Sequence, residues 1–212
     1  MSFAIAIDGP CAAGKTTSAK GLAELLGALY VDTGALYRGV AYGLLQDPGR
    51  NLGDIRVDLE YQGGVQRVFL DGDDISGNIR TEAVGKMASD VSARPEVRAF
   101  LLERQRQFAW ERSVVMEGRD IGSVVLPDAD IKFFLTANLD VRARRRLKEE
   151  PPGVDFQTVR KALDARDYAD FHRAVAPLVQ MPEAILVDNT NLSIVETVQV
   201  IDGICRLRHI PR

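Results

Sequence analysis

The sequence predicts an α/β fold with a mainly parallel sheet. Short apolar runs that suit buried strands alternate with longer segments in which apolar residues recur at helical spacing. The first of these runs leads into a glycine-rich turn and then a helix, the order of a β-loop-α unit. With 212 residues, 46% of them hydrophobic, we expect one domain with a substantial core and a small insertion.

The N-terminal elements follow from hydrophobic spacing. Residues 3–7 form an apolar run typical of a strand buried on both faces of a parallel sheet. Residues 15–26 carry apolar side chains at helical spacing, and a glycine follows them where a helix commonly ends. A second strand is predicted at residues 29–31, a turn at 32–34, and a helix over 36–45.

The alternation continues through the second half of the chain. Further buried strands are predicted at residues 114–116, 131–135 and 185–187. Helices are predicted at residues 95–110, 141–149, 158–168 and 193–208. Strands and helices that alternate this densely indicate a parallel sheet.

One stretch departs from this order. Residues 55–61 and 65–70 read as strands, and Asp71-Gly72 after them is a hairpin turn signal. We therefore interpret residues 55–92 as an insertion.

Bulk properties exclude several classes of protein. The net charge of -3 provides no general attraction to nucleic acid or to an anionic membrane. No segment approaches the roughly 18 consecutive apolar residues of a membrane span, and no basic flank precedes the N-terminal apolar run. We expect a soluble, cytoplasmic protein. Cys11 and Cys205 lack CxxC spacing, so both are expected to be free thiols.

Residues 9–16, GPCAAGKT, match the phosphate-binding P-loop pattern G-x-x-x-x-G-K-[ST] at every specified position. Backbone N–H groups of such a loop surround phosphates, Lys15 reaches the β and γ phosphates of ATP, and the Thr16 hydroxyl can bind Mg²⁺. The alternative is a glycine-rich turn that matches by chance. Cys11 is either a reactive thiol at a helix N-terminus or a small filler. The predicted ATP-binding residues are Gly9, Pro10, Cys11, Ala12, Ala13, Gly14, Lys15, Thr16 and Thr17.

A P-loop alone leaves a switch, a motor and a kinase open. A phosphate-ester acceptor beside ATP requires several arginines that can grip oxygens bidentately. Such arginines stand beside predicted turns and helix starts at Arg38, Arg98, Arg119, Arg166 and Arg173. They could meet at the carboxyl edge of the sheet, although for each one a solvated surface charge is the alternative. Arg119 is the exception, because it follows a buried strand.

Two further groups of charges have candidate roles in phosphoryl transfer. Glu117 ends the predicted strand at 114–116 and could hold hydrated Mg²⁺, or form a structural salt bridge. The basic cluster at 142–148 precedes Pro151-Pro152-Gly153, which predicts a mobile flap. This cluster could close over the ATP phosphates, or could be a solvated helix face. The residues predicted to be catalytic are Lys15, Arg119, Arg142 and Arg146.

Along nearly its whole length the chain resembles the cytidylate kinases of bacteria. The segments that carry the resemblance are IDGPCAAGKTT, DTGALYRGVA, DGDDISGNIRTEAV, MEGRDIGSVVLPDAD and RDYADFHRAVAPL. It implies transfer of the γ-phosphoryl of ATP to CMP or dCMP, giving ADP and CDP or dCDP, with Mg²⁺ required. Nothing in the sequence suggests more than a monomer, and we expect no nucleic-acid or membrane partner. It also implies a three-layer α/β/α kinase fold with a central five-stranded parallel sheet. The expected parts are a core of residues 1–54, 93–140 and 174–212, a nucleoside-monophosphate-binding insertion at about 55–92, and a helical lid at about 141–173.

The resemblance also implies an acceptor site. The CMP-binding residues that it implies are Thr33, Arg38, Ser89, Arg98, Arg119, Asp120, Arg166, Asp170 and Arg173. Asp120 would accept a hydrogen bond from the exocyclic amine of cytosine, where uracil presents a repelled carbonyl. The loop departs from the family's frequent GP-S/A-GAGK pattern, because one glycine is replaced by Ala12 or Ala13, depending on the alignment.

Three other functions are alternatives for a P-loop chain of this length. A regulatory GTPase lacks support, since the chain has no N-K-x-D signature. A nucleic-acid-binding ATPase would need aromatic residues among its basic ones, and the cluster at 142–148 has none. A small-molecule kinase with another acceptor, such as shikimate or a different nucleoside monophosphate, is the closest rival.

Overall fold

The computed structural model describes residues 2–211. The chain forms two compact units. Unit 1 comprises the residues up to Tyr30 together with those from Glu111 onward, and unit 2 comprises Val31–Trp110. Unit 2 contains the whole stretch 55–92 that was interpreted as an insertion.

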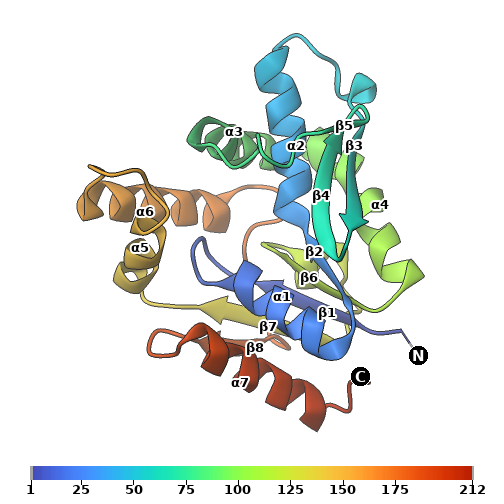
Figure 1. Cartoon of the computed structure of the whole chain (residues 1–212), viewed down its shortest axis with the longest axis vertical. Helices are drawn as coiled ribbons and strands as arrows, with labels where there is room; N and C mark the ends of the chain where they lie inside the picture. Colours follow the sequence, from blue (N-terminus) through green and yellow to red (C-terminus); the bar gives the residue numbers. More distant parts are fainter. Residues whose placement is uncertain (1, 212) are drawn as a thin grey trace. The chain divides into compact units, whose positions relative to one another are not determined.

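The central sheet is five-stranded and parallel, as predicted, with strand order β2-β6-β1-β7-β8 (Figure 1). Its strands are β1 (Ala4–Asp8), β2 (Leu29–Asp32), β6 (Val114–Gly118), β7 (Ile131–Thr136) and β8 (Ile185–Asp188). β1 lies between β6 and β7, where Ile5 pairs with both Val115 and Ile131. The predicted strands are therefore confirmed, and their carboxyl ends all reach one edge of the sheet.

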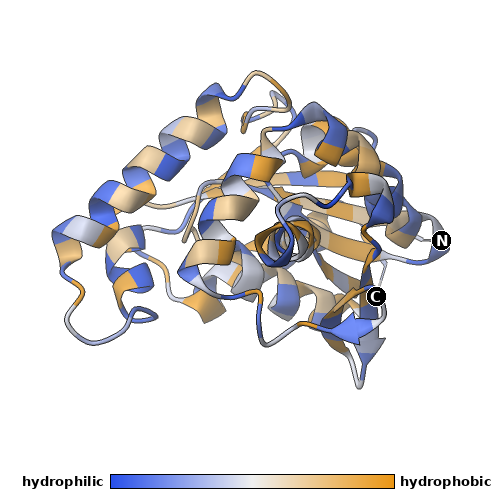
Figure 2. Ribbon diagram, turned by 90° about the horizontal axis from the view of Figure 1, so that it is seen from above, coloured by the Kyte–Doolittle hydropathy of each residue, from blue (hydrophilic) through white to orange (hydrophobic). Residues whose placement is uncertain are grey.

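The hydrophobic core of unit 1 explains why these strands form. Ile5 and Ile7 of β1 and Leu135 of β7 are fully buried, because helices cover the sheet. α1 (Lys15–Leu26) and α7 (Ile194–Leu207) pack against each other and contribute to the same apolar cluster. Figure 2 shows the sheet strands as mainly hydrophobic segments, in contrast to the mixed helices.

The helices of unit 1 begin and end at recognisable capping residues. α1 ends at Gly27, whose φ of 61° is the left-handed conformation expected there. Ser193 and Glu196 form a capping box at the start of α7. The remaining helices are α5 (Leu139–Leu147), α6 (Phe156–His172) and a π-helical turn at Ile121–Val125. No helix among residues 2–211 is long and apolar enough to cross a membrane.

Unit 2 combines helices with a small antiparallel sheet. The sheet has the order β3-β4-β5, formed by β3 (Val57–Gln62), β4 (Val65–Leu70) and β5 (Asp73–Asp74). The predicted hairpin is thus confirmed. The helices are α2 (Thr33–Gln46), a 3₁₀ turn at Leu52–Asp54, α3 (Glu82–Ser92) and α4 (Pro95–Glu111).

Two features of unit 2 differ from the sequence-based expectation. The turn predicted at 32–34 is wrong, because α2 begins at Thr33 and Asp32 caps it by accepting a hydrogen bond from the Ala35 N–H. The helix α3 was not predicted. Its only buried residues are Val84, Ala88 and Val91, a narrow stripe at helical spacing within an otherwise polar segment.

Candidate active site

The P-loop begins at a glycine that no other residue could replace. Gly9 has φ of 148°, and a Cβ there would lie 2.0 Å from the backbone oxygen of Leu135 in β7. The loop therefore leaves β1 in direct contact with the neighbouring strand. Gly14, with φ of 89°, provides a second left-handed residue immediately before α1.

The structure shows which alanine occupies the unusual glycine position of the loop. Ala12 has φ of 58°, the left-handed region that a Cβ disfavours, whereas Ala13 is not among the residues with positive φ. Of the two alanines, Ala12 is therefore the one with a backbone conformation that favours glycine. A residue other than glycine in this conformation costs roughly 1–2 kcal/mol.

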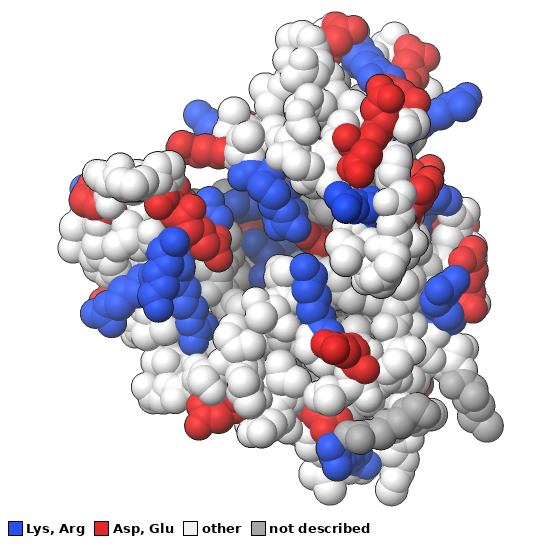
Figure 3. Space-filling model, in the orientation of Figure 1, with Lys and Arg blue, Asp and Glu red and all other residues white. Residues whose placement is uncertain are grey.

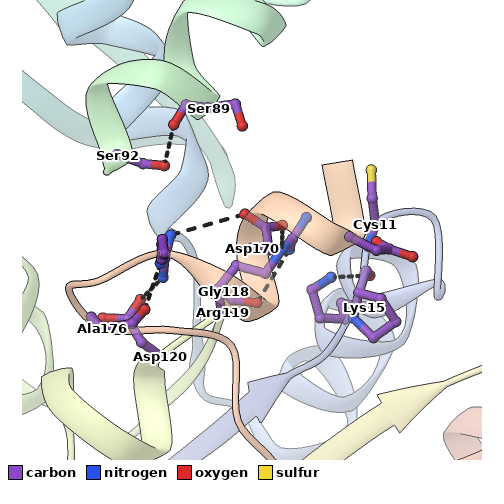
Figure 4. A network of polar contacts seen from close by, with 12 residues as sticks. Cys11, Lys15, Ser89, Ser92, Gly118, Arg119, Asp120, Asp170 and Ala176 are labelled. Carbon is purple, nitrogen blue, oxygen red and sulfur yellow. Dashed lines mark hydrogen bonds and ion pairs between the residues drawn. The ribbon is translucent and has the colours of Figure 1, made fainter. Parts of the chain in front are cut away.

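Lys15 is buried at the start of α1 and turned back onto its own loop. Its Nζ donates a hydrogen bond to the backbone oxygen of Pro10 at 2.8 Å (Figure 4). Burial, followed by the positive charge of Arg119, lowers the pKa of Lys15 to about 8, while Glu117 opposes this shift. An anionic phosphate would stabilise the charged ammonium better than this neutral carbonyl does.

Side chains from two helices hold the outer part of the loop. Arg142 of α5 donates to the backbone oxygen of Cys11 at 2.9 Å and pairs with Asp167 of α6 at 2.5 Å. Asp167 in turn accepts a hydrogen bond from the Cys11 N–H. After β8, the Nδ2 of Asn189 donates to the Ala13 oxygen at 2.9 Å, and Asn189 accepts from Arg145. The loop is therefore supported by residues from three distant segments.

The basic residues of the cluster at 142–148 have different surroundings and different partners. Arg142 is buried against the P-loop, whereas Arg146 is partly exposed and pairs with Glu150 at 2.7 Å and with Glu149. Arg144 lies over the ring of Phe156. Figure 3 shows basic side chains gathered over α5 on the displayed face.

The pKa of the Cys11 thiol reflects the positive charges around the P-loop. Burial by itself would raise its pKa, but the charges of Arg166, Arg119 and Lys15 outweigh burial and lower the pKa below its ordinary value. The same positive field favours phosphate oxygens. Cys205 is buried in the core, and burial raises its pKa to about 12. Both cysteines are free, as predicted.

A second charged network links the GRD segment to the end of α6 (Figure 4). The Nε of Arg119 donates to Asp170 at 2.7 Å. Arg173 lies between two carboxylates, 4.0 Å from Asp170 and 3.5 Å from Asp120. Burial opposes ionisation of Asp170, but Arg119, Arg166 and Arg173 outweigh it and lower its pKa. The Nε of Arg166 is buried without a hydrogen-bond partner among the residues that the structure describes.

The remaining predicted acceptor residues lie in unit 2. Thr33 is buried at the first position of α2, and Arg38 one turn later lies 3.3 Å from Asp32. Arg98 donates to the Ser92 oxygen at 3.1 Å, and its guanidinium lies over the Tyr37 ring. The backbone oxygen of Ser89 accepts a hydrogen bond from the Ser92 hydroxyl. Arg80, which the sequence analysis did not select, also pairs with Asp32 at 3.2 Å.

The cytidylate kinase family model matches residues 5–207, nearly the whole chain. The chain belongs to the cytidylate kinase family. Similar proteins include cytidylate kinases of Leuconostoc mesenteroides, 44% identical over 96% of both chains, and Fervidobacterium nodosum, 45% identical over 98% of both. A cytidylate kinase of Neisseria meningitidis is 47% identical over 92% of this chain and 93% of its own.

Solved structures agree at the level of the fold. An uncharacterised protein from Eubacterium ventriosum aligns with a TM-score of 0.59 at 13% identity, over 98% of this chain and 99% of its own. A gluconokinase from Sinorhizobium meliloti aligns with a TM-score of 0.53, also at 13% identity, over 98% and 94%. At such identity the likeness shows only a shared α/β fold.

In this member of the cytidylate kinase family, the structure adds residues that the sequence analysis missed. Asp167 and Asn189 hold the P-loop, and Tyr30 donates a hydrogen bond to the buried Glu117 carboxylate at 2.8 Å. Asp167 stands beside Arg166 and Asn189 directly follows β8, but neither position signals a partner more than 150 residues away. The hydroxyl of Thr16 and the carboxylate of Glu117 are oxygen donors of the kind that suits Mg²⁺.

Proposed function

We propose that this protein transfers the γ-phosphoryl group of ATP to CMP or dCMP, giving ADP and CDP or dCDP. One observation carries the proposal: unit 1 holds both the P-loop with Lys15 and a charged network that joins Arg119 through Asp170 and Arg173 to Asp120. Lys15 and Arg119 lie in the same part of unit 1 (Figure 4), and the charge of Arg119 contributes to the lowered pKa of Lys15. The cytidylate kinase relatives support the choice of acceptor.

On the donor side, residues 9–17 would bind the ATP phosphates. Lys15 would move from the Pro10 oxygen to the β and γ phosphates, and Thr16 would bind Mg²⁺, with Glu117 reaching the metal through water. The metal would neutralise charge on the phosphates. Arg142 would act mainly by holding the loop, since its guanidinium already contacts the Cys11 oxygen and Asp167.

On the acceptor side, Arg119 and Arg173 would hold the CMP phosphate in line with the γ-phosphate. Asp170 would accept hydrogen bonds from the ribose, and Asp120 from the exocyclic amine of cytosine. A phosphate dianion attacks without a strong general base, so positioning and charge neutralisation are sufficient. The further CMP contacts that we propose are Thr33, Arg38, Ser89, Arg98 and Arg166.

Movement of the chain would exclude water during transfer. We assign residues 141–173 to a lid and 55–92 to the acceptor-binding insertion, with the rest as core. Arg146, now paired with Glu149 and Glu150, would turn toward the transferring group when the lid closes. We further infer that the enzyme acts as a cytoplasmic monomer on dissolved nucleotides, which sedimentation and fractionation can check.

An acceptor panel tests the function directly. ADP release from ATP and Mg²⁺ is measured with CMP, dCMP, UMP, AMP, GMP or shikimate, and a Lys15→Met preparation controls for contaminating kinases. We expect the highest kcat/KM for CMP or dCMP, and loss of turnover with EDTA. Equal rates for UMP, or a preference for a purine nucleotide or shikimate, would reject the proposal.

A further inference from the structure

Asp8 is a buried carboxylate that the proposed mechanism does not use. It ends β1 directly before the P-loop, with a relative exposure of 6%. Its Oδ1 accepts a hydrogen bond from the Ile121 N–H, and its Oδ2 accepts one from the Gly122 N–H, both at 2.8 Å. These two N–H groups open the π-helical turn at 121–125.

The π-helical turn at 121–125 is capped by Asp8, which is distant in sequence, and not by Asp120, the residue that precedes it. The residue that precedes a helical turn commonly caps it with its own side chain, and aspartate does so especially well. Asp120 holds that position, yet its side chain makes no capping hydrogen bond. Its carboxylate lies instead 3.5 Å from Arg173, within the network of Figure 4. Because Asp8 satisfies the N–H groups from β1, Asp120 can point toward that network.

Close packing also restricts the turn at Gly122. A Cβ at Gly122 would lie 3.0 Å from Cδ of Lys132 and 3.5 Å from Oδ2 of Asp8. The Lys132 ammonium pairs with Glu183 at 2.5 Å, and the Lys132 side chain is buried. π-helical turns are rare and are frequent at functional sites. The backbone that follows Asp120 therefore hydrogen-bonds to Asp8 of β1 and packs closely against Lys132 of β7.

We propose that Asp8 is a positioning residue for recognition of the acceptor base: it caps the turn at 121–125 and so keeps the Asp120 carboxylate turned toward the acceptor. The inference rests on the proposed function, in which Asp120 contacts cytosine. Asp8 itself touches no substrate. It acts only through the turn.

The charges around Asp8 are consistent with this role. Burial raises its pKa to about 6, the hydrogen bonds from Gly122 and Ile121 oppose that rise, Asp120 adds to it, and Lys15 opposes it. At neutral pH the carboxylate is therefore ionised. Each of its oxygens can then accept an N–H.

Asp8→Asn tests the inference with little change in shape. One oxygen becomes an NH₂ group facing a backbone N–H, so the turn loses one cap and Asp120 is drawn back to it. We expect the ratio of kcat/KM for CMP to that for UMP to fall by at least about fivefold. The KM for ATP should change by less than about twofold, although Asp8 adjoins the P-loop. In an Asp120→Ala background, Asp8→Asn should lower the ratio no further.

Two other variants complete the design. Asp130→Asn is the matched control, because the exposed Asp130 caps the Ala4 N–H at the opposite end of β1 at 2.8 Å, and it should leave the ratio unchanged. Gly122→Ala keeps Asp8 intact but presses a methyl group on Lys132, and it should lower the ratio through the turn. This variant also serves if Asp8→Asn fails to fold, as checked by thermal unfolding.

The outcomes separate the two claims. If Asp120→Ala alone leaves the CMP to UMP ratio unchanged, the assignment of Asp120 in the proposed function is wrong. If Asp120→Ala lowers the ratio, but Asp8→Asn or Gly122→Ala preserves it or raises only the KM for ATP, the role of Asp8 is overturned and the function stands.

Discussion

Lys15, which is buried, and Arg119, which is partly buried, are cations of the same unit with opposite kinds of partner. The ammonium of Lys15 donates to the neutral Pro10 oxygen, whereas the guanidinium of Arg119 donates to the Asp170 carboxylate. Burial lowers the pKa of Lys15 to about 8. Burial also opposes the charge on Arg119, but the carboxylates, Asp170 first, outweigh it and raise the pKa of that group.

The positive charge of Lys15 therefore has only a neutral hydrogen-bond acceptor, whereas the positive charge of Arg119 is balanced by the Asp170 carboxylate. In the proposed function, Lys15 would gain a strong anionic partner when a polyphosphate binds, so its burial would belong to the binding site rather than to the fold. Arg119 is oriented by Asp170 before any ligand arrives, which is the preorganisation that electrostatic catalysis requires. The same two residues should therefore differ in activity, in stability and in response to pH.

The largest expected effect is the loss of activity when Lys15 is replaced. Lys15→Met should lower kcat by about 10²–10³-fold or more, because the phosphates lose the cation that stabilises their charge during transfer. The measurement is steady-state ADP formation with saturating CMP. Lys20→Met is the matched control on the exposed side of α1, where Lys20 lies over the Tyr30 ring, and it should retain nearly full activity. Comparable losses in both variants would contradict the assignment.

The free energy of unfolding should fall more when Arg119 is replaced than when Lys15 is replaced. Arg119→Met breaks a buried ion pair and should lower the free energy of unfolding by roughly 3 kcal/mol, whereas Lys15→Met should not lower it. Urea denaturation without nucleotide measures both. Arg206→Met provides a control, since its pair with Asp202 is exposed on the arginine side and is worth under about 1 kcal/mol. If Lys15→Met destabilised as much as Arg119→Met, the two cations would not differ as described.

The pH dependence of stability follows from the lowered pKa of Lys15. Between about pH 8 and the ordinary value of 10.5, the folded protein has lost a proton that the unfolded chain keeps. Stability should therefore gain from this residue as pH rises through that window, and the gain should be absent in Lys15→Met. Urea titrations of both proteins at pH 7, 8 and 9 measure the difference. Parallel dependences on pH would show that the pKa of Lys15 is not lowered.

The smallest expected effect concerns the loop that carries the Pro10 oxygen. Ala12→Gly relieves a left-handed alanine but makes the unfolded chain more flexible, so its net effect on stability should lie within about 1 kcal/mol and on the stabilising side. Ala13→Gly has no such strain to relieve and should destabilise by about 0.5–1 kcal/mol. Thermal unfolding compares the two. The same sign for both would argue against the conformation of Ala12.

Local signals in the sequence predicted most elements of unit 1. The strand at 3–7 is uniformly apolar and the one at 131–135 is apolar except for Lys132, a pattern that suits a doubly covered parallel sheet, and this arrangement is found. The helix α3 escaped prediction because its buried stripe is only three residues wide. The start of α2 escaped because Asp32 resembles a turn residue and acts as a helix cap.

The site was predictable by residue type but not by pairing. The P-loop pattern identified Lys15, and the GRD segment identified Arg119, yet neither pattern indicates that the first donates to a carbonyl and the second to a carboxylate. Asp170 lies 51 residues from Arg119, and Asp8 lies 113 from Ile121, so only the folded sheet brings them together. Spacing rules apply within one element, whereas these contacts join elements.

The hydrogen bond from Asn189 to the Ala13 oxygen has a consequence for biosynthesis. The two residues are 176 positions apart, so the ribosome completes the nucleotide-binding loop long before it makes the side chain that holds it. β7 and β8 must also form before Asn189 can reach the loop. The P-loop of a nascent chain therefore lacks this hydrogen bond until almost all of the chain has been synthesised.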